Sequence, residues 1–102
     1  MTKQEITNKV KQSIELIDPK AKVILFGSRA RGDFNKNSDW DFLILTSKNS
    51  DESLKRKIRE VLIDTELEAE EVISTLIYSQ QVWSDYKATP LYKNISAEGF
   101  IL

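Results

Sequence analysis

Two neighbouring stretches dominate this sequence: LFGSRARGD at residues 25–33 and SDWDFLI at residues 38–44. The first stretch ends an apolar run, Ala21–Phe26, which predicts a buried strand that stops at Gly27. The second begins with two acidic residues and continues as a longer apolar run, which predicts a strand over Asp39–Thr46. A buried strand, a glycine-containing turn and an acidic strand therefore follow one another closely in the chain.

The turn carries groups that bind anions. Gly27 has no side chain, so a ligand can approach its backbone closely. Ser28 offers a hydroxyl and a backbone N–H where a helix can begin, and such amides favour phosphate. Arg29 and Arg31 add guanidinium groups whose paired donors match phosphate oxygens. The candidate phosphate ligands are therefore Gly27, Ser28, Arg29 and Arg31, and surface pairing of the arginines, for example with Asp33, is the alternative.

Asp39 and Asp41 stand two residues apart on the predicted strand, so their carboxylates share one face. Two carboxylates this close repel each other unless a cation lies between them. Mg²⁺ prefers oxygen ligands and readily shares them with substrate phosphates. The two aspartates are thus candidate Mg²⁺ ligands, and their nearness to the turn predicts one site for metal and polyphosphate. A solvated strand edge is the alternative.

The composition narrows the chemistry that this site can use. The 102 residues include no cysteine and no histidine, which excludes thiolates and imidazoles as nucleophiles, bases or metal ligands. The net charge of −1 and the lack of a continuous basic face disfavour direct nucleic-acid binding. The length predicts a single domain over residues 1–102. The lack of a long apolar run or a signal-like start predicts a cytoplasmic protein without a membrane span.

Apolar periodicity and capping residues predict the rest of the secondary structure. The further elements are helices over Thr2–Ile17, Asp51–Asp64, Gln80–Tyr86 and Pro90–Glu98, a third strand over Val72–Tyr78 and an extended piece over Phe100–Leu102. We expect the acidic run 66–71 to be a solvated loop or edge and the basic cluster 55–59 to be a solvated helix face. This order predicts an α/β (α+β) fold, with a small mixed sheet and helices packed mainly on one side.

The Gly27-Ser28 turn followed by Asp39-x-Asp41 resembles the signature of the nucleotidyltransferase superfamily that includes DNA polymerase β, poly(A) polymerases and kanamycin nucleotidyltransferase. The fuller pattern, 26–32 with 38–42, is most similar to the minimal nucleotidyltransferase branch, and residues 90–99 are similar to that branch's usual ending. The resemblance implies transfer of a nucleoside monophosphate, AMP from ATP, to a hydroxyl with loss of pyrophosphate. It also implies that Gly27 and Ser28 contact the β- and γ-phosphates, and that Asp39 and Asp41 are catalytic ligands of Mg²⁺.

One position departs from this family. The family usually has a third carboxylate on the next strand, which binds metal and acts as the base for the acceptor hydroxyl. Here that position falls at Ser74, and serine is neither an anion nor a base at neutral pH. Glu70 or Glu71 can replace it only if the strand register differs. Otherwise catalysis is slower, depends on a base from a partner, or is lost.

The resemblance also implies a partner. The minimal branch is commonly paired with a small helical HEPN-domain protein in prokaryotic toxin–antitoxin modules, where the nucleotidyltransferase is the antitoxin and can adenylylate the toxin. We therefore expect a HEPN-domain toxin, or a second copy of this chain, to supply the acceptor surface. The alternative is a binding module of the same fold that neutralises its partner by contact alone, which Ser74 favours.

Overall fold

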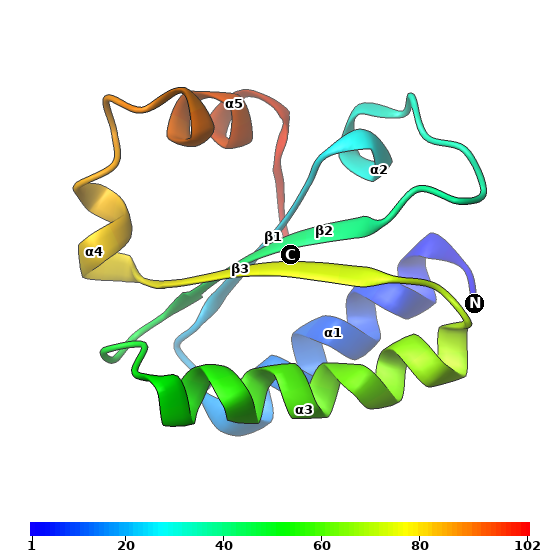
Figure 1. The fold of residues 1–102 in the computed structure, drawn as a ribbon, viewed down its shortest axis with the longest axis horizontal. Coiled ribbons are helices and arrows are strands. Elements are labelled where there is room, and N and C mark those ends of the chain that lie inside the picture. Colours follow the sequence, from blue (N-terminus) through cyan, green and yellow to red (C-terminus); the bar gives the residue numbers. More distant parts are fainter.

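Four strands form one mixed sheet in the order β3-β2-β1-β4 in a computed structural model that describes residues 1–102 (Figure 1). The antiparallel pairs are β1 with β2 and β1 with β4, whereas β2 and β3 run parallel. The strands are β1 (Lys22–Phe26), β2 (Trp40–Thr46), β3 (Ile73–Ser79) and β4 (Phe100–Ile101). The predicted mixed sheet is thereby confirmed, and β2 lies at its centre.

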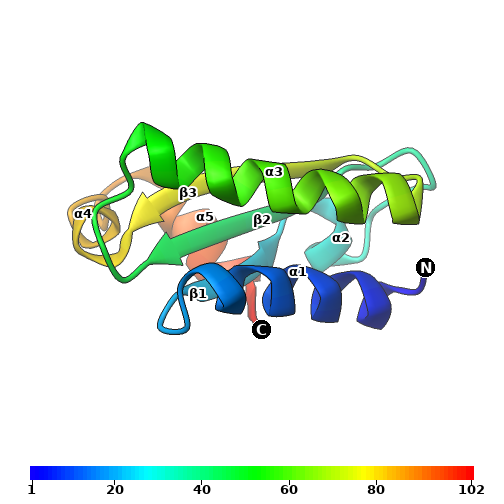
Figure 2. The same cartoon turned by 90° about the horizontal axis from the view of Figure 1, so that it is seen from below.

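Helices cover both faces of this sheet unequally. The five helices are α1 (Lys3–Ile17), α2 (Ser28–Arg31), α3 (Glu52–Ala69), α4 (Gln80–Ser84) and α5 (Pro90–Glu98). The two long helices, α1 and α3, lie side by side beneath one face, while the short α4 and α5 lie over the other (Figures 1 and 2). The fold class predicted from the sequence is therefore confirmed, with the two long helices on a single side.

The larger core fills the space between the sheet and the two long helices. Because strand side chains alternate between faces, Val23 and Leu25 of β1 point to this side together with Phe42 and Ile44 of β2. They meet apolar residues spaced three or four apart on α1 and α3: Ile6, Val10, Ile14, Ile58 and Leu62. The start of α1 has the capping box that the sequence predicts, between Thr2 and Glu5.

The opposite face of β2 presents Asp41, Leu43 and Leu45 in turn. Leu43 and Leu45 are buried in a second, smaller core with Trp83 of α4 and Ile95 of α5. Tyr78, Tyr86 and Tyr92 pack around Trp83 with ring centroids 5.2 to 5.9 Å apart. These aromatic residues build the smaller core, and the same face of the sheet carries Asp41 beyond them.

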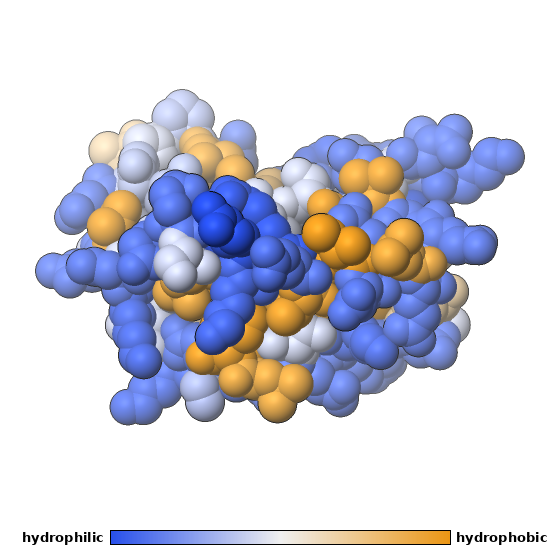
Figure 3. Space-filling model, turned by 60° about the horizontal axis from the view of Figure 1, so that its bottom comes forward, coloured by the Kyte–Doolittle hydropathy of each residue, from blue (hydrophilic) through white to orange (hydrophobic).

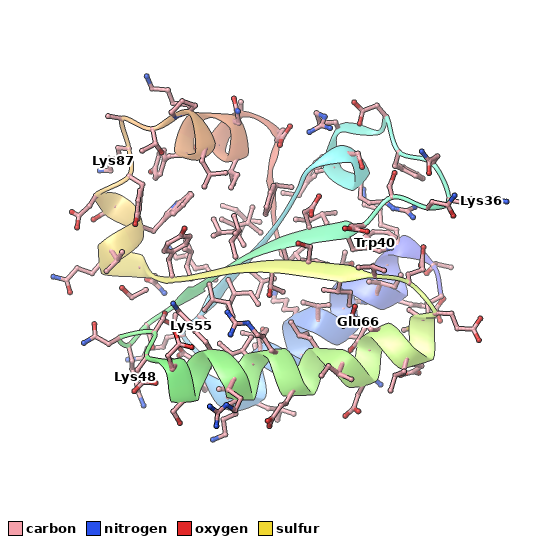
Figure 4. The ribbon with its side chains drawn as sticks, in the orientation of Figure 1. Lys36, Trp40, Lys48, Lys55, Glu66 and Lys87 are labelled. Atoms are coloured by element: carbon pink, nitrogen blue, oxygen red, sulfur yellow. The ribbon has the colours of Figure 1, made fainter.

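Helix α3 is longer than the sequence predicts, because it continues to Ala69 and so includes Glu66 and Glu68. The buried Thr65 extends the apolar stripe past the expected end of the helix. Glu66 lies on the sheet side of α3 (Figure 4), where its Oε2 accepts a hydrogen bond of 3.0 Å from the N–H of Ile73. The expectation that this acidic run is a loop or edge is therefore wrong for its helical part. Two other bounds also shift: α3 begins at Glu52, with Asp51 as its N-cap, and α4 ends at Ser84.

The face formed by the two long helices is mainly hydrophilic, with separate apolar patches (Figure 3). Exposed apolar side chains on these helices are Leu16, Ile63 and Leu67. Arg56, Lys57 and Arg59 near the start of α3 are exposed, as expected, whereas Lys55 is half-buried. Lys48 and Lys55 lie at that end of the helix (Figure 4). None of the helices combines the length and the apolar character that a membrane span requires.

Candidate active site

The glycine turn and the acidic strand meet at one end of the sheet. Phe26, the last residue of β1, pairs with Asp41 of β2, so Gly27 leaves the sheet beside that aspartate. Gly27 has φ 76° and ψ −163°, a conformation that is essentially restricted to glycine. A Cβ atom at this residue would collide with Oδ2 of Asp41. Residue 27 must therefore be glycine for two reasons, its backbone conformation and the carboxylate that lies against it.

The short helix α2 follows at once and fixes the turn. The backbone N–H groups of Ala30 and Arg31 each donate to the carbonyl of Gly27 at 3.0 Å, and Gly32 donates to the carbonyl of Ser28 at 2.9 Å. Ser28 is the first residue of this helix and is half-buried. It thus stays next to Gly27, where the sequence predicts contact with phosphate.

Asp39 and Asp41 differ in their surroundings. Asp39 directly precedes β2 and is exposed, whereas Asp41 is half-buried. Burial raises the pKa of Asp41, and the charge of Asp39 raises it further; Arg31 opposes this rise, and Glu98 adds to it. A carboxylate whose charged form is disfavoured in this way is stabilised by a cation bound beside it.

The carboxylate ligands present fit a magnesium ion that is bound together with a polyphosphate. The chain has no group of three or more His, Cys, Asp or Glu side chains arranged to hold a metal ion. Mg²⁺ is usually held by one or two carboxylates and takes its other ligands from water and substrate phosphates. Asp39 and Asp41 are the pair that could hold it here.

Ser74 lies directly beside Asp41. The parallel register of β2 and β3 pairs these two residues, and Ser74 is exposed. Neither alternative acidic residue lies on the strand: Glu70 ends α3 in the left-handed conformation, and Glu71 pairs with Arg29. The position at which the resemblance implies a third carboxylate thus carries a hydroxyl beside Asp41.

Arg29, predicted as a phosphate ligand, is buried inside the protein. Its guanidinium lies 4.5 Å from the ring centroids of both Phe34 and Trp40. It also donates to the carbonyl of Ser38 at 3.1 and 3.3 Å and forms a 3.1 Å ion pair with Glu71. Trp40 is the first residue of β2 and directly follows the loop that joins α2 to β2 (Figure 4). These contacts favour a structural role, in which Arg29 holds the loop before β2 in place.

Arg31 lies on the other side of α2 from this sandwich and contacts Glu98, which was not among the predicted site residues. Its Nη1 lies 2.9 Å from Oε2 of Glu98, and its Nε lies 3.2 Å from Oδ2 of Asp33. The pairing of an arginine with Asp33, noted as an alternative, is therefore present. The hydrogen bonds with Glu98 and then with Asp33 raise the pKa of Arg31.

Glu98 completes this arrangement from the end of α5. Its Oε1 accepts a hydrogen bond of 3.3 Å from the N–H of Gly27, 71 residues away in the sequence. Its side chain is only 19% exposed. The only sequence signal for Glu98 was its place in residues 90–99, which resemble the usual ending of the minimal nucleotidyltransferase branch. That resemblance does not indicate what Glu98 contacts.

Comparison with known proteins identifies proteins that are similar to most of the chain. The family model described as "Nucleotidyltransferase domain" matches residues 5–99. A Methanocaldococcus jannaschii protein named "Putative protein adenylyltransferase MJ0141" is 36% identical over 84 residues, which cover 80% of this chain and 85% of that protein. A solved structure described as a toxin–antitoxin with AMP-PNP has a similar fold, with a TM-score of 0.64, 18% identity and coverage of 92% of this chain and 69% of that one.

Proposed function

Because this chain belongs to the nucleotidyltransferase-domain family, we propose that it transfers AMP from ATP to a hydroxyl group of a partner protein. The observation that supports this most strongly is the contact between Gly27 and Asp41, since it joins a phosphate-binding turn to a metal-binding carboxylate. The name of the Methanocaldococcus jannaschii relative supports adenylyl as the group transferred and protein as the acceptor.

In this proposal the acceptor oxygen forms a bond to the α-phosphorus, the bond from that phosphorus to the bridging oxygen breaks, and pyrophosphate leaves. The backbone N–H of Gly27, the side chain and N–H of Ser28 and the guanidinium of Arg31 hold the β- and γ-phosphates. Asp39 and Asp41 hold Mg²⁺, whose charge stabilises the phosphates when it is bound. The hydroxyl proton passes to water or to a base of the partner, because Ser74 is not a base at neutral pH.

We propose a HEPN-domain toxin as that partner, with this chain as its antitoxin in the cytoplasm. The fold shared with one chain of a toxin–antitoxin structure supports this setting. The acceptor hydroxyl then belongs to the toxin, so that the modified partner loses its activity.

A second candidate is a binding module that neutralises the toxin by contact without transferring AMP. Ser74 is the observation that favours it, since a hydroxyl lies beside Asp41 where the resemblance implies a carboxylate that binds metal and accepts a proton. The two candidates differ only in whether a covalent bond forms.

The experiment that separates them uses ATP labelled at the α-phosphate, Mg²⁺ and the protein encoded by the neighbouring gene, which on this proposal is a HEPN-domain toxin. The proteins compared are the wild type, Asp39→Asn and Asp41→Asn, with Asp64→Asn on the exposed side of α3 as the matched control. Transfer predicts label on the partner with the wild type and Asp64→Asn, and none with the two site variants. Protection of cells by all four proteins without any label would overturn transfer in favour of the binding module.

A further inference from the structure

Glu98 occupies the donors that the proposed function assigns to the triphosphate. One of its carboxylate oxygens accepts from the N–H of Gly27 at 3.3 Å, and the other lies 2.9 Å from Nη1 of Arg31. A carboxylate and a phosphate group present the same kind of acceptor oxygens to such donors. In the nucleotide-free protein, Glu98 therefore takes the place of a phosphate group.

Glu98 and the triphosphate cannot use these donors at the same time. The amide of Gly27 has a single hydrogen, which Glu98 already accepts. Glu98 is also an anion close to Asp41, and Arg31 is half-exposed with its Nε held by Asp33. An incoming triphosphate would meet both an occupied donor and a negative charge in a partly desolvated place, where charge repulsion is stronger than in water.

Hydrogen bonds hold the backbone that follows Glu98, whereas the side chain of Glu98 can change rotamer. The N–H of Gly99 donates to the carbonyl of Ile95 at 2.8 Å, and Phe100 and Ile101 pair with β1. Gly99 itself leaves no room for a side chain, since a Cβ there would lie 2.7 Å from Cγ2 of Ile24. A change of side-chain rotamer at Glu98 is therefore enough to release both donors.

We infer that Glu98 competes with the triphosphate for the donors of Gly27 and Arg31. It occupies these donors when no nucleotide is bound, and it is displaced from them when nucleotide binds. This inference rests on the proposed function, because it takes Gly27 and Arg31 as phosphate ligands. It makes Glu98 a residue that sets the affinity for nucleotide, and it explains how Arg31 is held at the site before substrate arrives.

The test measures binding of a non-hydrolysable ATP analogue with Mg²⁺ by calorimetry to the wild type, Glu98→Gln and Glu98→Ala. Glu68→Gln is the matched control, because it removes a glutamate from an ion pair of the same 2.9 Å length, with Lys9, between the two long helices. We expect Glu98→Gln to bind the analogue about fivefold more tightly than the wild type, the effect of one partly exposed ion pair. Glu98→Ala, which also frees the N–H of Gly27, should gain at least as much, and Glu68→Gln should bind as the wild type does.

Equal or weaker binding by both Glu98 variants, with thermal unfolding like that of the wild type, would overturn the inference and make Glu98 a positioning residue. A second measurement needs no variant: the side-chain carboxyl ¹³C signal of Glu98 in the wild type should shift on saturation with the analogue, and an unmoved signal would also overturn it. Failure of the proposed function looks different, because then neither the wild type nor any variant gives heat with the analogue.

Discussion

The carboxylate of Asp41 lies in the space that a side chain at Gly27 would occupy. Gly27 follows the last residue of β1, Phe26, which pairs with Asp41 on the adjacent antiparallel strand β2. The contact forms because β1 ends at the residue before Gly27, while β2 has only just begun at Trp40. The turn and the acidic strand therefore share one end of the sheet, and changes at either residue should affect the other.

Gly27→Ala should abolish binding of Mg²⁺ with an ATP analogue, because its Cβ forces the Asp41 carboxylate away. Gly32→Ala is the control, since Gly32 also has a positive φ of 92° but has nothing near a Cβ. That variant should lose only about 1–2 kcal/mol of unfolding free energy from backbone strain, and Gly27→Ala should lose more. Denaturant unfolding and calorimetry check both; unimpaired analogue binding by Gly27→Ala would contradict the geometry.

Ser74→Asp should raise adenylyl transfer about tenfold or more, because it places a third carboxylate beside Asp41 that can bind metal and accept a proton. Without Mg²⁺ the variant should be less stable than the wild type, since like charges lie side by side, and added Mg²⁺ should restore its stability. Labelled product and thermal unfolding with and without Mg²⁺ measure the two effects. Ser74→Asn, which adds similar bulk without charge, should show neither; an equal gain with Asn would refute the explanation.

Arg29→Gln and Arg31→Gln should have opposite profiles. Loss of Arg29 leaves Glu71 without its partner in a partly buried place and removes the packing between Phe34 and Trp40, so we expect a loss of about 2–4 kcal/mol of unfolding free energy. Loss of the half-exposed Arg31 should cost less than about 1 kcal/mol. Binding of the ATP analogue should weaken by about tenfold with Arg31→Gln, since it removes a hydrogen bond to a charged phosphate. Weaker analogue binding by Arg29→Gln without a large loss of stability, together with unchanged binding by Arg31→Gln, would show that Arg29 is the phosphate ligand.

Asp18→Asn should lower stability at neutral pH but matter little in acid. Burial alone would raise the pKa of Asp18, but hydrogen bonds from the hydroxyl and N–H of Ser47 and from the N–H of Lys20 hold that pKa below its ordinary value. A lowered folded-state pKa gives stability that is present above the unfolded value, about 3.9, and is lost as the pH falls through the folded value. The variant should therefore lose about 2 kcal/mol at pH 7.

The difference between Asp18→Asn and the wild type should then shrink as the pH falls below about 4. Thermal unfolding of both proteins across this range measures it. Asp64→Asn, on an exposed position of α3, should stay within about 0.5 kcal/mol of the wild type. A difference for Asp18→Asn that does not change with pH would show that its charge is not what stabilises the fold.

Much of this protein follows from short-range pattern. Apolar runs placed β1 and β2 to within one residue, and Thr2 and Thr89 marked the starts of α1 and α5. Asp39 and Asp41 pointed to metal and phosphate because aspartate is rare on an apolar strand. Such signals suffice for these elements because turns, caps and strand periodicity depend on residues a few positions apart.

The tertiary structure alone decided which side chains meet. Arg29 and Arg31 stand two residues apart and look equivalent in the sequence, yet α2 directs one into an aromatic sandwich and the other to Glu98. The parallel register put Ser74 beside Asp41, and the docking of α5 brought Glu98 to Gly27 across 71 residues. Local pattern cannot fix these contacts, because they arise from the packing of whole helices and strands into one core.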